Sequence, residues 1–167
     1  MAVEEVPNWE DELSPEQLRL FQAQRGDSRA LVTSLREDRE FQLALARADT
    51  RPYLLSWFSE TEGWLADEER SGPIGEQSVG TEWSWTGVHD DAGPPGAFNG
   101  IAPSGRPVTV SGFTLMSADG DRFTVRRYID WAGLFAQLGL TLNWRVPVAG
   151  TRYETRPADA AEVPGSR

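Results

Sequence analysis

The segment from Asp119 to Gly139 constrains the fold of this chain more than any other, because it predicts a turn, a strand and a helix in direct succession. Asp119-Gly120 lies between two β-rich runs and predicts a hairpin, since both residue types tolerate positive φ. Residues 123–130 alternate between two chemically different sets, as in a strand. Gly139 is placed to close a short amphipathic helix whose apolar residues are Trp131, Leu134, Phe135 and Leu138.

Asp130 stands where the predicted strand ends and the helix begins. Asp is a favoured N-cap, because its carboxylate accepts hydrogen bonds from the first free amides of a helix, and this contributes about 1 kcal/mol. A catalytic role is the alternative that the pattern leaves open. Helix amides lower the pKa of a carboxylate, so Asp130 can be an effective acid or base only if its oxygens point into a cavity.

Helical signals dominate the N-terminal half. The segment SPEQ at 14–17 is a capping box with proline at the first helical position, and it predicts a helix to about residue 25. Asp27 is expected to cap a second short helix. Residues 40–46 favour a strand, although their Ala and Leu content leaves a helix open. A third helix is expected to begin at Thr50, with Pro52 in its first turn.

Strand signals follow after Trp64. Residues 78–89 and 106–117 predict strands, and the Gly- and Pro-rich residues 90–105 between them predict a loop. Helices first and strands afterwards predict an α+β fold, with the helices gathered on one face of a curved antiparallel sheet. We expect one domain at residues 13–148, a flexible arm at 1–12 and a disordered tail at 149–167.

The composition of the chain limits the classes of partner and cofactor that it can bind. The net charge is −10 with no dense Lys/Arg cluster, which argues against nucleic acid and anionic membranes. The chain has no cysteine and one histidine, so thiol chemistry is excluded and a zinc site would lack ligands. The acidic N-terminal segment has no apolar stretch, and a cytoplasmic protein is expected. Several of the seven tryptophans lie in the β-rich half, where they can form the core or line a pocket for a flat ligand.

Three runs resemble a known family in order and spacing. They are WSWTGVH at 83–89, GIAPSGRPVTVSGFTLMSADGDRF at 100–123 and RRYIDWAGLFAQLG at 126–139. Together they resemble the SnoaL-like polyketide cyclase group of the NTF2-like superfamily. The resemblance implies a cone-shaped α+β barrel, usually dimeric, whose N-terminal helices and curved antiparallel sheet enclose an apolar cavity. Residues 90–99 look longer than the matching loop of the family, which implies a reshaped pocket mouth.

The resemblance also implies a site. Asp130 would act as acid and base, with His89 near the same pocket and no metal or organic cofactor. The candidate substrate-binding residues are Trp83, Trp85, Tyr128, Trp57, Phe113 and Arg126. Each has a structural alternative: His89 can cap loop amides, the tryptophans can be core, Tyr128 can lie at a dimer interface, and the arginines can form exposed ion pairs.

The hypothesis that follows is a cofactor-independent cyclase that closes a ring in a polyketide or another polycyclic natural product. An intramolecular aldol closure needs a base to remove a proton α to a carbonyl and an acid to protonate the oxygen that forms, and a desolvated carboxylate can serve as both. The alternatives are an enzyme with the same cavity and a different chemistry, such as epoxide opening or hydroxylation, and a non-catalytic module that binds a small molecule or dimerises.

Overall fold

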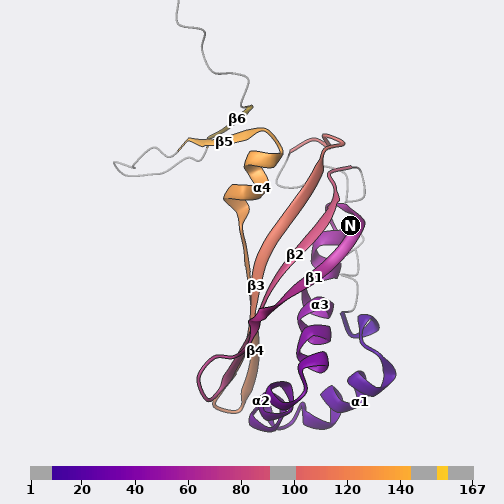
Figure 1. Ribbon diagram of the computed structural model, residues 1–167, viewed down its shortest axis with the longest axis vertical. Helices are drawn as coiled ribbons and strands as arrows, with labels where there is room; N and C mark the ends of the chain where they lie inside the picture. Colours follow the sequence, from indigo (N-terminus) through magenta and orange to yellow (C-terminus); the bar gives the residue numbers. More distant parts are fainter. Residues whose placement is uncertain (1–8, 91–100, 144–153, 158–167) are drawn as a thin grey trace, which may run out of the picture.

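The computed structural model of the 167-residue chain describes residues 9–90, 101–143 and 154–157 (Figure 1). The N-terminal part is helical, with η1 (Trp9–Glu12), α1 (Pro15–Gln24), α2 (Ser28–Glu37) and α3 (Arg39–Leu55). Four long strands follow, namely β1 (Ser59–Pro73), β2 (Ser78–Val88), β3 (Pro107–Asp119) and β4 (Arg122–Ile129). The last elements are α4 (Trp131–Gln137), β5 (Leu140–Asn143) and β6 (Glu154–Pro157).

The first two helices begin where the sequence predicts. Ser14 Oγ accepts a hydrogen bond from the Gln17 N–H at 3.2 Å, and Gln17 Oε1 accepts one from the Ser14 N–H at 2.9 Å. Asp27 Oδ1 accepts from the two amides of residues 29 and 30 and so caps α2. The capping box and the Asp27 cap are therefore confirmed, since each satisfies amides that a helix leaves without an internal partner.

The strand predicted at 40–46 is wrong, and so is the helix start predicted at Thr50. Both segments belong to α3, which begins at an N-cap that the sequence analysis missed: Asp38 Oδ1 accepts from the Phe41 N–H at 2.9 Å. An Ala- and Leu-rich run has high helix propensity, and the helix buries Phe41, Leu45 and Ala48 on one side. Pro52 consequently lies inside the helix rather than in its first turn.

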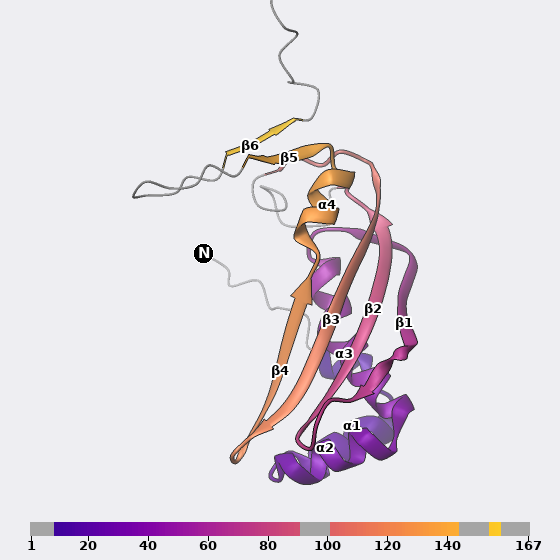
Figure 2. The same cartoon turned by 60° about the vertical axis from the view of Figure 1, so that its left-hand side comes forward.

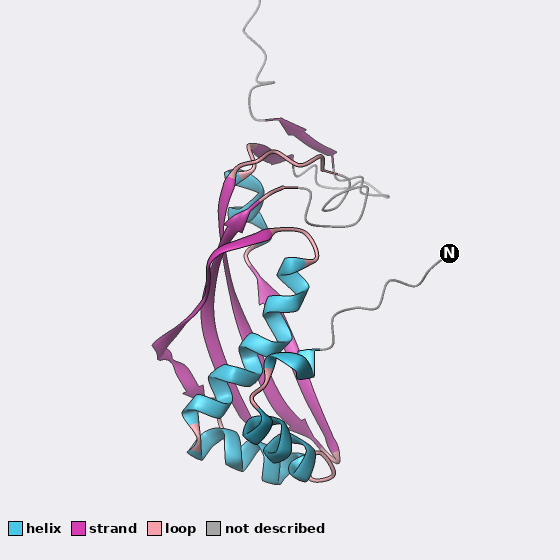
Figure 3. Ribbon diagram, turned by 90° about the vertical axis from the view of Figure 1, so that its right-hand side faces the viewer, coloured by secondary structure: helices cyan, strands magenta, loops and turns pink. Residues whose placement is uncertain are grey.

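The strands form an antiparallel sheet in the order β1-β2-β3-β4, and β5 pairs with β6 in a separate two-stranded sheet. The long sheet is curved and twisted, and α1, α2 and α3 cover one of its faces (Figures 2 and 3). In the described part of the chain, β1 and β4 stay apart and leave the sheet open. The α+β prediction is confirmed, and the strands predicted at 78–89 and 106–117 correspond to β2 and β3.

The hairpin and the helix at 119–139 also form as predicted. Gly120 has φ of 62° in the turn between β3 and β4, and Gly139 has φ of 78° directly after α4. Both are left-handed conformations that glycine adopts without strain. Residues 9–12, at the end of the expected arm, form η1, in which Trp9 packs edge-on against Phe21 at 5.0 Å. β6 lies within the expected tail, and the remaining parts of the arm, the tail and the 90–105 loop lie partly outside the described residues.

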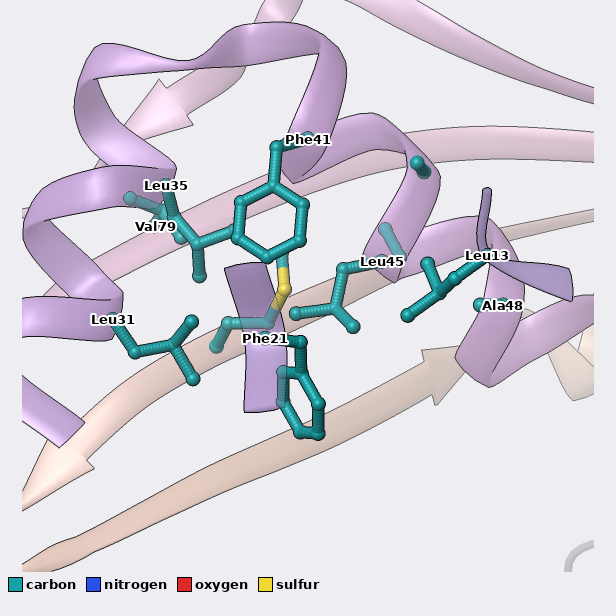
Figure 4. Close-up of a cluster of buried hydrophobic side chains, with 11 residues drawn as sticks. Leu13, Phe21, Leu31, Leu35, Phe41, Leu45, Ala48 and Val79 are labelled. Carbon is teal, nitrogen blue, oxygen red and sulfur yellow. The ribbon is translucent and has the colours of Figure 1, made fainter. Parts of the chain in front are cut away.

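We call the helix-covered face of the sheet the inner face and the opposite one the outer face. Two apolar clusters fill the inner face. The first joins α1, α2 and α3 to the sheet near the hairpin end, and its buried side chains include Phe21, Leu31, Leu35, Phe41, Leu45 and Val79 (Figure 4). The second lies around Trp83 and Trp85 and receives Leu134 and Leu138 from α4.

Candidate functional site

The strand register separates the predicted site residues into two sets on opposite faces. Trp83 pairs with Gly112 in a row of inner-face positions, whereas the next row pairs Phe113 with Tyr128 on the outer face. Side chains alternate between faces along each strand. The inner set is therefore His89, Trp83, Trp85 and Trp57, and the outer set is Asp130, Tyr128, Phe113 and Arg126.

Asp130 caps α4. Its Oδ1 accepts a hydrogen bond from the Gly133 N–H at 2.9 Å, and the residue is exposed. The space for this carboxylate exists because residue 133 is glycine, since a Cβ there would collide with the Asp130 side chain. The oxygens thus lie over the first turn of the helix, which is the capping alternative of the sequence analysis.

A shallow groove of about 480 Å³ runs beside Asp130 on the outer face. Its lining combines two carboxylates with aromatic and small side chains, namely Glu82, Asp130, Phe113, Tyr128, Ile129, Ser111 and Gly112. Three members of the outer set therefore meet in one groove. It is wide open to solvent.

His89 is buried at 1% exposure on the inner face and organises the loop that leads into β3. Its Nδ1 lies 3.3 Å from the Ser104 N–H, which donates to it, and 3.1 Å from Ser104 Oγ. Its carbonyl accepts from the Ser104 and Gly105 amides at 3.1 and 2.7 Å. Burial lowers the pKa of His89, although Asp90 raises it in part, so the ring is neutral at pH 7. These contacts are those expected of the loop-capping alternative.

The indoles of Trp83 and Trp85 are core side chains with satisfied N–H groups. Trp83 Nε1 donates to Thr114 Oγ1 at 3.0 Å, and Trp85 Nε1 donates to Glu60 Oε2 at 2.9 Å. Arg51 donates to both oxygens of the same Glu60 carboxylate, at 2.8 and 3.1 Å. These bonds fix both rings, so the two tryptophans form a rigid part of the second cluster, which we call the tryptophan floor.

Half-buried aromatic side chains surround this floor. We call four of them the aromatic rim; they come from the end of α3, the turn after it and α4, and they are Tyr53, Trp57, Trp131 and Phe135. Tyr53 and Trp57 meet edge to face at 4.4 Å, and Trp131 stacks on Phe135 at 6.1 Å. All four pack against the cluster that contains the two buried tryptophans. Rigid aromatic surface that is only half buried is suited to contact a flat organic molecule.

A polar pair that the sequence analysis missed lies beside the rim. Arg127 Nε donates to Asp49 Oδ2 at 3.0 Å, and Arg127 Nη2 donates to the Asp49 carbonyl at 2.8 Å. The guanidinium also lies over the Tyr53 ring at 4.2 Å. Burial raises the pKa of Asp49, and the charge and hydrogen bonds of Arg127 lower it only in part. Asp49 and Tyr53 are spaced i and i+4, a signal that would have appeared had 39–55 been read as one helix, and Trp57 follows in the turn after that helix.

Metal sites and membrane-spanning helices were also sought among the described residues. These residues contain no group of three or more His, Cys, Asp or Glu side chains that could hold a metal ion. None of the helices traced there is long and apolar enough to cross a membrane. The chemistry available near the rim is that of a carboxylate, a guanidinium and a phenol.

Comparison with known proteins adds little to this geometry. No model of a known protein family matches the chain, and no curated protein matches it. Among solved structures, the chain is similar to TsrD from Streptomyces laurentii, with 15% sequence identity, a TM-score of 0.41, and coverage of 77% of this chain and 98% of that one. A likeness at this level carries no argument about activity, so the SnoaL-like affinity stays a resemblance.

Proposed function

We propose that the chain is a cofactor-independent cytoplasmic enzyme that binds a flat apolar or aromatic small molecule and moves protons on it. The reaction we propose is the ring closure inferred from the sequence, an intramolecular aldol step on a polyketide or another polycyclic intermediate. The proposed architecture is an NTF2-like cone, and the helices over one face of a curved sheet support it.

The observation that carries the proposal is the aromatic rim on its tryptophan floor. Tyr53 lies in the last turn of α3, Trp57 in the turn after it, and Trp131 and Phe135 on α4, and all four rings pack against one cluster. Large aromatic rings supply contact area at low conformational cost, and they favour flat ligands over flexible ones. Acid/base chemistry is favoured at this place because burial raises the basicity of a carboxylate there.

A second candidate is the outer groove, where Asp130, Tyr128 and Phe113 line one hollow. Binding of a ligand there would return Asp130 to the catalytic role that the sequence suggests. The groove is less suited to proton transfer, because Asp130 is exposed and already accepts the Gly133 N–H.

Binding of 2-naphthol, measured by the quenching of tryptophan fluorescence, distinguishes the aromatic rim from the outer groove as the binding site. Trp57→Ala is expected to weaken binding about tenfold, the loss of about 1.4 kcal/mol that one aromatic contact provides. The matched variant Phe113→Ala, on the opposite face, is expected to bind as the wild type does. Weaker binding by Phe113→Ala and unchanged binding by Trp57→Ala would indicate that the ligand binds in the outer groove. A wild-type protein that binds no flat aromatic probe would refute the proposal. Circular dichroism checks that both variants fold.

We also propose that the chain is a homodimer that pairs through the outer face. The support is apolar surface on that face, where Leu65 and Tyr128 are 59% and 52% exposed. Sedimentation equilibrium is expected to give twice the monomer mass, and Leu65→Lys to reduce it. A wild-type monomer at tens of micromolar would contradict this part of the proposal.

A further inference from the structure

We infer that Asp49 is the catalytic residue that takes up and returns the proton at the aromatic rim, and that Arg127 is its positioning residue. This inference rests on the proposed function and names its reacting group. Asp49 lies outside the three runs that resemble the SnoaL-like group, whereas Arg127 lies within the run at 126–139.

One oxygen of Asp49 is held and the other is left for chemistry. Arg127 binds Oδ2 and the main-chain carbonyl, so the carboxylate has a fixed orientation. Among the described residues, none donates a hydrogen bond to Asp49 Oδ1, and this atom is not among the fully buried atoms that lack a partner. Both side chains keep 22% of their surface exposed. The lone pairs of Oδ1 can therefore meet a ligand without first breaking a protein contact.

The position of Asp49 relates it to the rim. It lies one helical turn before Tyr53 on α3, and Arg127 joins it to the Tyr53 ring through a cation–π contact of 4.2 Å. A flat ligand that stacks on Tyr53 or Trp57 would present its edge toward the same helix face. The proposal places an edge C–H of such a ligand at this carboxylate.

The surroundings also suit a base. Burial destabilises the charged carboxylate and raises its pKa, while the charge and hydrogen bonds of Arg127 lower the pKa in part. A carboxylate that is less solvated than in water is a stronger base, and its conjugate acid is still a usable donor at the end of the reaction.

The step balances without a cofactor. Asp49 Oδ1 removes a proton from a carbon α to a carbonyl, so that the C–H bond breaks, an O–H bond forms on Asp49, and the electron pair enters an enolate. The enolate carbon then forms a bond to a second carbonyl carbon of the same molecule. Asp49 returns its proton to the alkoxide that results, and no electrons are gained or lost overall.

The test uses 5-nitrobenzisoxazole, a flat aromatic probe that needs only a base. Removal of its C–H proton breaks the N–O bond and releases a coloured 2-cyano-4-nitrophenolate. The wild type is expected to accelerate this ring opening with saturation, and Asp49→Asn to lower kcat about 100-fold, the usual contribution of one general base. Asp67→Asn, which alters an exposed carboxylate paired with Arg70, is the matched control and should keep the wild-type rate.

A pH profile separates catalysis from a structural role. Since the charge of Arg127 lowers the pKa of Asp49, Arg127→Gln is expected to move the rising limb of the kcat profile to higher pH while Asp49 remains in place. A purely structural ion pair would change stability and leave the midpoint where it was. If Asp49→Asn does not fold, the pH profile of Arg127→Gln still tests the inference.

Three outcomes overturn the inference: a wild-type kcat in Asp49→Asn, an unmoved midpoint in Arg127→Gln, or probe binding by the wild type with no acceleration of ring opening. In each of these cases 2-naphthol binding can persist, so the proposed small-molecule site survives. If the wild type itself shows no saturable binding of 2-naphthol, both the proposed function and this inference are refuted.

Discussion

Replacement of Asp130 by Ala is the change that best distinguishes a helix cap from a catalytic carboxylate. The structure gives Asp130 one hydrogen bond of 2.9 Å to the Gly133 N–H, at the first turn of a seven-residue helix. Loss of an N-cap costs about 1 kcal/mol, and loss of a negative charge near a helix N-terminus costs roughly 0.3–1 kcal/mol more. Asp130→Ala should therefore lower the free energy of unfolding by about 1–2 kcal/mol.

The matched variant is Asp130→Ser, which keeps a capping oxygen and removes the charge. It should lose only about 0.3–1 kcal/mol. Urea unfolding followed by tryptophan fluorescence measures both, and with a slope of about 2 kcal/mol/M the Ala variant should shift the midpoint down by roughly 0.5–1 M.

A different order of stabilities would refute the capping account. If Asp130→Ala is as stable as the wild type, the hydrogen bond to Gly133 contributes nothing. If it is more stable, the carboxylate is held in an unfavourable place, as functional groups often are, and the catalytic reading of Asp130 regains support.

Three further predictions follow from buried contacts. His89 is the sole histidine, so its ring proton resonance is unambiguous in NMR. Because burial lowers its pKa, the titration midpoint should lie below 6.5, and the free energy of unfolding should fall as the pH drops below that value. A midpoint at or above 6.5 would contradict the burial of the ring. Burial acts to raise the pKa of Glu60, but Arg51 and the Trp85 N–H together lower it. Glu60→Gln should therefore be less stable than the wild type at pH 7, and the difference in stability should shrink as the pH falls below 4.5. A difference that does not change with pH would argue against these contacts of the Glu60 carboxylate. Gly112→Ala should cost at least about 1–3 kcal/mol, because its Cβ would collide with the Trp83 ring and the β4 backbone, and an unchanged urea midpoint would mean that the two strands pack less closely than described.

The segment from 119 to 139 could be predicted because its signals are local. Asp119-Gly120 permits a turn, Asp130 supplies a cap and Gly139 allows a left-handed C-terminus, whatever the rest of the chain does. In such places the side chain that determines the structure lies within a few residues of the backbone that it satisfies.

The secondary structure of residues 40–55 was harder to predict, because a short apolar run can form either a strand or a helix. The deciding residue was Asp38, whose carboxylate caps α3 two residues before the run. The error hid the candidate site as well, because Asp49 and Tyr53 share a face only when one helix runs through both.

The division of the site between two faces could not be predicted from alternation alone. Alternation within β4 correctly put Tyr128 and Asp130 on one side, but only the pairing of Phe113 with Tyr128 and of Trp83 with Gly112 shows that His89 lies on the other. Register between strands depends on contacts distant in sequence, and a shift of one residue would exchange the faces.

The central claim is that ligands bind on the inner face, at the aromatic rim and beside Asp49. Titration of isotope-labelled protein with 2-naphthol, followed by the indole and backbone N–H signals in two-dimensional NMR, tests it most directly. The account predicts the largest shifts at the Tyr53 and Trp57 amides and the Trp57 and Trp131 indoles. Largest shifts at Gly112, Phe113 and Tyr128, around the outer groove, would contradict it.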